Sequence, residues 1–413
     1  MRDVAIVGAG PAGAVLAARL ARAGLNVLLI ERAPTWRWHA GGVFASPAAV
    51  EALRRSGLDS GIIQRVTRPI PAMRLETPGG AVVRLTYGAD RGGAPAVGFD
   101  RSALDPALVA MARAAGATVL TGVTVRGVDL GSGWGRWRGR RDQRVRLDLL
   151  SAGSTDTVVD ARIVVGADGA GSRVARAAGV ARTVRLPPRI GITYHVPDGR
   201  GEVAADARMR VLDDGYVGIA PVPGGRVNVG IVLGRSWAGA LAAEGAAAVA
   251  SRVVAGFQPT DQDDLGWATA PPCDHVAGAA PLGVRVTRRA GVGWFLVGDA
   301  AGFLDPFTGE GLHRALVSTG LAAPAIVAAV RRPESAAGAA AAYDRAMRRR
   351  FAAKDAVSWL VQVFLARPML FEYAARRLAA RPDVRATMGL VMGDLIPAAR
   401  GLDPRFLAAL LAP

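Results

Sequence analysis

The feature that most constrains this chain is a glycine-rich turn near its N-terminus, between an apolar strand at residues 3–7 and a predicted helix. Glycines let the backbone approach a pyrophosphate closely, and the N-terminus of the next helix then faces the negative charge. A second apolar stretch ends at Glu31, where an acid can accept hydrogen bonds from ribose hydroxyls. A bare turn of this kind also occurs in ordinary strand-to-helix connections, but here strand, helix and acid are in register. The pattern predicts a dinucleotide site formed by Gly8, Gly10, Pro11, Ala12, Gly13, Glu31 and Arg32.

Length and composition bound the class of protein. The chain has 413 residues, 51% of them hydrophobic, which is enough for two domains or one large interleaved domain. It has no run of 18 or more uncharged apolar residues, so we expect no spanning helix, and we expect no signal peptide before the first strand. The single cysteine, Cys273, excludes internal disulfides and cysteine-cluster metal sites, so no metal is expected. We expect a cytoplasmic protein, either a monomer or a homodimer.

The net charge of +17 does not by itself indicate nucleic-acid binding. Nearly all basic residues are arginine, Lys354 is the only lysine, and alanine and glycine abound, as in proteins encoded by GC-rich genomes. The arginines are spread along the chain, apart from a cluster at residues 136–146 beside two tryptophans. We interpret that cluster as an exposed hairpin loop and expect no nucleic-acid partner.

Two further landmarks each place an acid and glycines directly after a short apolar strand. Residues 163–167 lead to Asp168 and Gly169, and residues 294–297 lead to Gly298 and Asp299. Asp299 is placed to hydrogen-bond ribityl or ribose hydroxyls.

A Gly/Pro-rich loop follows Asp299 and runs into a helix predicted from Leu312 to about Val330. The N-terminus of that helix can stabilise negative charge on a reduced flavin ring. The loop residues expected to face the flavin are Pro306, Gly309, Gly311 and Leu312.

These landmarks, in this order, resemble the FAD-dependent oxidoreductases of the para-hydroxybenzoate hydroxylase and geranylgeranyl reductase superfamily, over about residues 1–330. The helix that begins after Asp100 is similar to the segment of this superfamily whose arginine, here Arg101, contacts FAD. The resemblance implies tightly bound FAD, NAD(P)H as electron donor, and further cofactor contacts from Gly41, Gly42 and Val125.

The resemblance also implies an α/β fold in which a Rossmann-like FAD-binding domain is interleaved with an antiparallel-sheet substrate domain, followed by C-terminal helices. Apolar alternation predicts the strands of that second sheet at residues 190–196, 207–212, 216–221 and 226–233. The predicted FAD-binding parts are residues 1–75, 99–180 and 286–332, the substrate-domain parts are 76–98 and 181–285, and the helical region is 333–413.

Motif details divide between two branches of the superfamily. Aromatic hydroxylases usually have an arginine three residues after the serine of the second motif, at position 175 here, but this chain has it one residue later, at Arg176. That position and the sequence Thr-Gly-Glu-Gly at residues 308–311 are features that reductases tend to have. However, residues 40–42 read Ala-Gly-Gly where reductases often have Cys-Gly-Gly, and residues 218–221 lack the tryptophan that often precedes the proline. Flavin-dependent halogenases rely on a lysine in the substrate pocket. The only lysine here, Lys354, lies in a late predicted helix, so a halogenase is disfavoured.

The leading hypothesis is a flavoprotein monooxygenase that hydroxylates a small lipophilic substrate, aromatic or polyketide-like, with NAD(P)H and O2. The alternatives are a geranylgeranyl reductase-like enzyme that saturates prenyl double bonds and a flavin-binding accessory protein without turnover. His39 and His195 are the candidate catalytic residues, since either can orient a phenol or move a proton, while His313 is interpreted as structural. The C-terminal helices either cover the substrate domain or contact a membrane peripherally.

Overall fold

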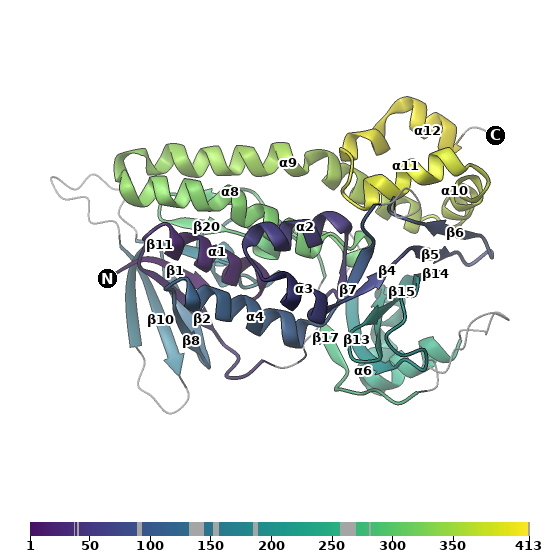
Figure 1. Ribbon diagram of the computed structural model, residues 1–413, viewed down its shortest axis with the longest axis horizontal. Helices are drawn as coiled ribbons and strands as arrows, with labels where there is room; N and C mark the ends of the chain where they lie inside the picture. Colours follow the sequence, from purple (N-terminus) through teal and green to yellow (C-terminus); the bar gives the residue numbers. More distant parts are fainter. Residues whose placement is uncertain are drawn as a thin grey trace.

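The computed structural model describes residues 1–36, 38, 41–88, 93–131, 144–151, 157–184, 189–256, 270–280 and 282–411. Figure 1 shows two sheets side by side, the first near the N-terminus and the second at the opposite end, with long helices running above both. His39 and residues 132–143, which include most of the arginine cluster, lie outside the described residues.

The first sheet has eight strands, in the order β19-β20-β11-β1-β2-β8; in addition, β10 pairs antiparallel with β11, and β9 pairs antiparallel with β10. The four pairings from β20 to β8 are all parallel. Buried parallel strands read as continuous apolar runs, as at Val4–Val7. The strands are β1 (Arg2–Val7), β2 (Val27–Glu31), β8 (Thr118–Thr121), β9 (Val123–Asp129), β10 (Val145–Ser151), β11 (Thr157–Gly166), β19 (Ala290–Gly291) and β20 (Trp294–Leu296).

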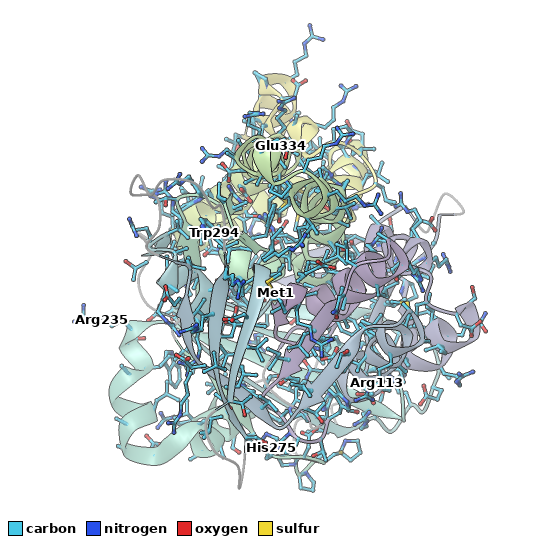
Figure 2. All side chains as sticks on the ribbon, turned by 90° about the vertical axis from the view of Figure 1, so that its left-hand side faces the viewer. Met1, Arg113, Arg235, His275, Trp294 and Glu334 are labelled. Carbon is cyan, nitrogen blue, oxygen red and sulfur yellow. The ribbon has the colours of Figure 1, made fainter. Side chains whose placement is uncertain are left out.

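Helices pack around this sheet, as the crossover connections of a parallel sheet require. Figure 2, viewed from the end where Met1 lies, shows Glu334 above the sheet and Arg113, at the end of α4, to one side. The helices of this unit are α1 (Pro11–Arg22), α2 (Pro47–Ser56), α3 (Ser60–Val66), α4 (Arg101–Ala114), α5 (Arg173–Ala177) and α8 (Gly311–Arg331), with 3-10 turns η3 (Gly298–Ala301) and η4 (Pro306–Thr308).

The apolar run near residues 119–128 contains two strands, β8 and β9. Gly122 adopts φ of +71° and ends β8, after which β9 leaves β2 and pairs with β10. The sequence pattern does not show this break, because the apolar residues run on past it and only the glycine marks the turn.

The second sheet has seven strands, in the order β17-β13-β16-β15-β14-β5-β6. It contains all four strands predicted from alternation, and the predicted fold class is confirmed. The domain boundaries stay a prediction. The strands are β5 (Met73–Glu76), β6 (Val82–Leu85), β13 (Ile190–Pro197), β14 (Ala207–Leu212), β15 (Gly215–Val222), β16 (Arg226–Leu233) and β17 (Ala277–Ala279).

The two faces of this sheet are covered differently. On the outer face, Ile192, Tyr194 and Val229 pack with α6 (Ala238–Ala255), which follows η2 (Arg235–Trp237). Because side chains alternate along a strand, the inner face carries Thr193 and His195 instead. This inner face points toward the first unit and the C-terminal helices.

A small sheet joins the two large ones. Its strand β7 passes so close to β15 that a Cβ on Gly98 would overlap with the carbonyl oxygen of Pro221. A separate two-stranded antiparallel sheet, formed by residues 181–183 and 284–286, completes the strands. The remaining strands are β3 (Phe44–Ala45), β4 (Thr67–Ile70), β7 (Ala96–Phe99), β12 (Ala181–Thr183) and β18 (Val284–Val286).

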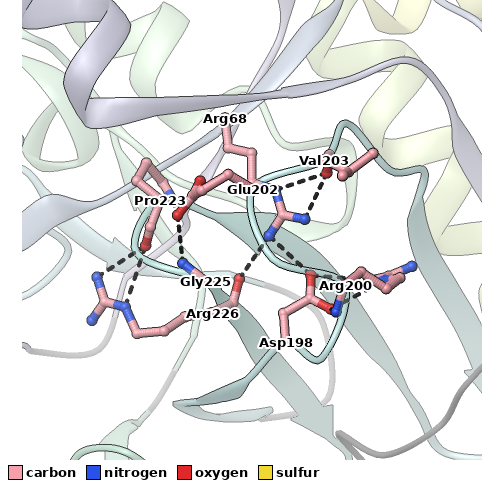
Figure 3. Close-up of polar contacts among 8 residues, drawn as sticks. All are labelled: Arg68, Asp198, Arg200, Glu202, Val203, Pro223, Gly225 and Arg226. Carbon is pink, nitrogen blue, oxygen red and sulfur yellow. Dashed lines mark hydrogen bonds and ion pairs between the residues drawn. The ribbon is translucent and has the colours of Figure 1, made fainter.

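A buried arginine fixes this junction (Figure 3). Arg68 of β4, 1% exposed, forms an ion pair with Asp198 at 2.9 Å and donates two hydrogen bonds to the carbonyl oxygen of Val203. It also approaches the carbonyl oxygen of Arg226, the first residue of β16, at 3.4 Å. The guanidinium therefore holds the loop after β13 and the start of β16 against β4.

The C-terminal helices cover the top of the molecule. α9 lies along α8 and continues toward the second sheet, where α10 and α11 pack on β6 (Figure 1). Each of these two helices begins at a proline, α10 at Pro368 and α11 at Pro382. They are η5 (Pro333–Ser335), α9 (Ala336–Leu365), α10 (Pro368–Ala380), α11 (Pro382–Met392), η6 (Ala398–Leu402) and α12 (Pro404–Leu411).

Two helical segments, residues 235–255 and 311–331, have the length and apolar composition that could cross a membrane. We had expected none. The finding is weak, because α8 packs against α1 and α9 in the core and because Gly245, with φ of +81°, interrupts α6.

Candidate active site

The first glycine-rich turn leaves no room for side chains. Gly8 adopts φ of +95°, and a Cβ there would lie 2.5 Å from the carbonyl oxygen of Ala167, in the second motif. A Cβ on Gly13 would overlap with the carbonyl oxygen of Gly8. The N-terminus of α1, with Gly10 as N-cap and Pro11 as first residue, has no side-chain cap. Its free N–H groups suit an anion such as a pyrophosphate.

Glu31 lies at the end of β2 and fixes the turn. Its carboxylate accepts hydrogen bonds from the backbone N–H groups of Ala9 at 2.9 Å and Ala33 at 3.0 Å. Arg32 beside it is exposed, and Ala12 is buried in α1. The acid therefore sits beside the glycine turn, as the spacing predicted.

Arg101 brings separate motifs together. Its side chain is 15% exposed and pairs with Asp105 at 2.6 Å. Its Nη1 would lie 2.6 Å from a Cβ on Gly41, and its Nη2 would lie 3.6 Å from a Cβ on Gly10. The guanidinium thus lies between the first turn and the loop after β2.

The acidic residues around Arg101 keep its guanidinium charged. Burial opposes the charge of Arg101, but Asp105, Asp299 and Glu31 outweigh it and raise its pKa. Arg101 is therefore a fixed cation within reach of acids from the first and third motifs.

Asp168 has one carboxylate oxygen engaged and one free for a ligand. Its Oδ2 accepts from the backbone N–H of Arg173 at 2.7 Å, while its buried Oδ1 has no partner in the described part of the chain. Burial raises the pKa of this carboxyl. Gly169 follows with φ of +75°. A buried acceptor without a partner is costly, so this oxygen suits a ligand hydroxyl or N–H.

The third motif forms a compact loop between β20 and α8. Burial raises the pKa of Asp299, although Arg101 and Arg314 oppose the shift. Gly298 adopts φ of +59° and donates its N–H to Ser318. These residues place the Asp299 carboxyl in a partly buried position where the charge of Arg101 acts on it.

The loop from Asp305 to Gly309 is anchored to the second sheet. Asp305 accepts hydrogen bonds from the hydroxyl of Tyr216 at 2.6 Å and from Arg189 at 2.9 Å. Its Oδ1 also accepts from the backbone N–H of Phe307, where Pro306 begins a 3-10 turn. The end of that turn, Gly309 with φ of +63°, packs against the ring of Phe44.

Five of the predicted cofactor residues lie outside these contacts. Arg32 and Gly42 are exposed, Gly311 and Leu312 begin α8, and Val125 is buried in β9, paired with Leu149. The rest converge on one region with a close backbone approach, an uncapped helix N-terminus, a buried cation and an unpartnered acceptor. That arrangement fits the pyrophosphate and hydroxyl groups of FAD.

The inner face of the second sheet has an uncovered strip. Gly218 and Gly230 pair across β15 and β16, and both remain partly exposed although they lie in central strands. Ala220 extends the strip on one side, and Met209 borders it on β14. Bare backbone in the middle of a sheet marks a place where another molecule can approach closely.

His195 lies at one end of this strip. Its Nδ1 is 2.6 Å from Asp274, its ring contacts the ring of Trp38 at a centroid distance of 4.1 Å, and its Nε2 is buried without a partner in the described residues. Asp274 and Trp38 could not be assigned to this site from sequence, because neither lies in one of the cofactor motifs.

Comparison with known proteins identifies the family. The chain is 29% identical over 329 residues to menaquinone reductase of Mycolicibacterium smegmatis, covering 78% of this chain and 75% of that protein. It is 27% identical over 362 residues to digeranylgeranylglycerophospholipid reductase of Methanosphaerula palustris, covering 84% and 81%.

Solved structures show the same fold. A geranylgeranyl bacteriochlorophyll reductase-like protein from Thermoplasma acidophilum matches with a TM-score of 0.76 and 21% identity, over 99% of this chain and 98% of that chain. The flavin-dependent halogenase CmlS matches with a TM-score of 0.73 and 24% identity, over 94% and 67%. Residues 1–215, more than half of the chain, match the family described as FAD binding domain. The chain therefore belongs to this family and is an FAD-dependent oxidoreductase.

Proposed function

We propose that this protein is an FAD-dependent reductase that saturates a carbon–carbon double bond of a lipophilic, prenyl-type substrate. The observation that carries the proposal is the bare strip of Gly218 and Gly230 between two apolar clusters of the inner face. On one side lie Trp38 and Ala220, and on the other lie Met209 and Phe307. A strip bordered by apolar side chains suits a long hydrocarbon chain.

The small residues explain how this chain differs from the reductase pattern. Where that pattern has a tryptophan before the proline, this chain has Gly218 and Ala220 on the inner face. The missing bulk leaves the backbone uncovered. We infer a wider passage for substrate at this point.

The chain's own residues would position the reacting groups. Bound FAD supplies hydride chemistry. Asp299, Arg101 and Asp168 would hold the cofactor, and the loop anchored by Asp305 would fix the edge of the site near the second sheet. The buried surroundings of these residues would keep bulk water out. NAD(P)H is the proposed electron donor.

A surface pocket suits the apolar tail of such a substrate. It is lined by Trp359, Gln362, Val363, Ala366 and Arg367. Gln362 accepts a hydrogen bond at 2.7 Å from the same guanidinium that contacts the 305–309 loop. Arg189 therefore connects the pocket, through Gln362, to the 305–309 loop, through Asp305. This surface is the proposed route by which a lipid reaches the site.

Peripheral membrane contact is proposed for the same surface. Trp359 and Val363 of α9 and Met369 and Tyr373 of α10 are exposed, Met369 by 87%. Exposed apolar side chains beside arginines suit an anionic lipid surface.

A monooxygenase remains the second candidate, acting on an aromatic or polyketide-like substrate. The favouring observation is the His195–Asp274 pair at the end of the strip, since a neutral imidazole held by a carboxylate can orient a phenol. A flavin-binding accessory protein is the non-enzymatic alternative.

The test mixes anaerobically reduced, FAD-loaded protein with menaquinone or with a digeranylgeranylglycerophospholipid in detergent. The proposal predicts reoxidation of the flavin, followed by absorbance, and a product that gains two hydrogen atoms by mass spectrometry. Hydroxylation of a phenolic or polyketide substrate, with one atom from labelled oxygen gas, would support the second candidate instead. If no donor reduces the flavin and no substrate reoxidises it, the accessory protein gains support.

A further inference from the structure

Two ring nitrogens, on side chains whose rings contact each other, are buried without a hydrogen-bond partner in the described residues. They are Nε2 of His195 and Nε1 of Trp38, and neither has a partner in the part of the chain that the structure describes. His195 is 1% exposed and Trp38 is 8% exposed, and their rings meet edge to face with an interplanar angle of 60°. Burial takes each nitrogen away from water and provides no other hydrogen-bond partner, which costs free energy. A ligand that forms a hydrogen bond with the nitrogen would remove this cost.

Asp274 determines which of the two nitrogens donates. Its Oδ1 accepts from the backbone N–H of His195 at 2.9 Å, and its Oδ2 lies 2.6 Å from Nδ1. A carboxylate there requires the proton on Nδ1, so Nε2 of a neutral ring is an acceptor. Burial lowers the pKa of His195, although Asp274 opposes the shift, and the ring is therefore neutral at pH 7. The indole Nε1–H of Trp38 can only donate.

We propose that His195 and Trp38 together bind a hydroxyl group of the substrate. A hydroxyl donates and accepts through one oxygen, so it matches one acceptor and one donor. A carbonyl oxygen would leave His195 unmatched, and an ammonium would leave Trp38 unmatched. The inference deepens the proposed function, on which it rests for the lipophilic body of the substrate.

The surroundings restrict what carries the hydroxyl. Ala220, Ala277 and Val222 lie in the same buried cluster as Trp38. Besides Asp274, the charges that act on His195 are Arg226 and Asp100, which pair with each other at 2.7 Å. His195 lies in the row of Asn228 and Ala220 across β13, β16 and β15, which borders the bare Gly218–Gly230 pair. The hydroxyl therefore ends an apolar body that lies along the strip. Asp274 is a positioning residue, since it acts through His195.

The experiment compares hydroxyl probes with their methyl ethers on the FAD-loaded protein by isothermal titration calorimetry. One arm uses 2-naphthol and 2-methoxynaphthalene, and the other uses geraniol and geranyl methyl ether. We expect the hydroxyl form to bind about tenfold more tightly in at least one arm, the effect of leaving one buried polar group unmatched. The arm that shows the preference identifies a ring hydroxyl or a chain-end hydroxyl.

Two variants test the assignment. Asp274→Ala frees the imidazole tautomer, so Nε2 is no longer fixed as an acceptor and the preference should fall to near one. Trp38→Phe keeps the ring and removes a donor from which hydroxyl and ether oxygens can both accept, so it should weaken both probes and keep the preference. Cys273→Ser is the matched control, because its exposed side chain leaves the backbone hydrogen bond to His195 in place and should change neither affinity nor preference. A merely structural role of Asp274 would weaken hydroxyl and ether equally.

The outcomes separate this inference from the proposed function. No binding of either probe pair, no preference in the unaltered protein, a preference unchanged by Asp274→Ala, or affinities unchanged by Trp38→Phe would each overturn the hydroxyl site. A preference that Asp274→Ala abolishes, in a protein whose flavin no prenyl lipid reoxidises, would keep the site and overturn the reductase.

Discussion

Arg226 Nη2 lies 2.7 Å from Asp100 Oδ2, and this ion pair links the second sheet to the helix that carries Arg101. Asp100 is the N-cap of α4, where its other oxygen accepts from the backbone N–H of Ser102 at 2.8 Å. Arg226 begins β16, and its carbonyl oxygen lies 3.4 Å from Nη1 of Arg68. The substrate-facing sheet thus contacts the residue that immediately precedes a candidate cofactor arginine.

Arg226→Gln should weaken FAD binding about threefold to tenfold, because the partly buried ion pair contributes on the order of 1 kcal/mol to the position of α4. The measurement is the FAD dissociation constant of the apoprotein, by fluorescence quenching. Arg252→Gln is the control, since Arg252 pairs with Glu244 on the exposed helix α6. Equal affinities in the variant and the unaltered protein would contradict the coupling.

Asp299→Ala should weaken FAD binding more strongly, by about tenfold to a hundredfold, through loss of a charge-assisted hydrogen bond worth roughly 1.5–3 kcal/mol. Asp299→Asn keeps an acceptor oxygen and should retain part of the affinity. Equilibrium dialysis of both variants with FAD gives the two constants. Unchanged affinity in the alanine variant would show that the FAD site lies elsewhere.

Arg68→Met should lower the free energy of unfolding by about 3–5 kcal/mol, because it leaves the buried carboxylate of Asp198 without its main partner. Urea denaturation followed by circular dichroism measures the loss. Arg200→Met, which removes the more exposed second partner of Asp198, should cost much less. Equal losses in the two variants would contradict the role of burial.

Local patterns predicted the elements that hold the cofactor motifs. The turns at Gly8, Asp168 and Asp299 each follow a buried strand directly, so short spacing was enough to find them. Alternation along β13 explains why Tyr194 packs in the outer cluster while His195 contacts Trp38 on the inner face. The cofactor contacts themselves stay predictions.

Partners distant in sequence could not be predicted. Asp274 lies 79 residues from His195, and Asp100 lies 126 residues from Arg226. Such pairs depend on how two sheets meet, and single residues outside a motif carry no pattern. His313, interpreted as structural, is also explained by a distant partner, Asp394.

Asp394 is the centre of a buried charge cluster beside α8. It lies 2.9 Å from His313 Nδ1 and 2.9 Å from the Nζ of Lys354, and it accepts from the hydroxyl of Ser46. Burial opposes ionisation of Asp394, but the hydrogen bond from His313 and the charge of Lys354 outweigh it and hold its pKa well below the ordinary value. The sole lysine of the chain therefore has a structural partner.

Asp394→Asn should destabilise the protein at neutral pH and have a diminishing effect in acid. Because the folded-state pKa is depressed, the carboxylate contributes stability fully above its unfolded-state pKa of about 4, and the contribution is lost as the pH falls below that value. Asparagine tolerates the left-handed backbone of this position, φ of +59°, so the variant isolates the charge.

Urea denaturation at pH 7, 5, 4 and 3 measures this dependence, with exposed Asp213→Asn as the control. The difference in unfolding free energy between the unaltered protein and Asp394→Asn should be constant from pH 7 to 5 and should shrink from about pH 4 downward. A difference that stays constant down to pH 3 would mean that the carboxylate contributes through its shape and hydrogen bonds and that its charge has no effect on stability.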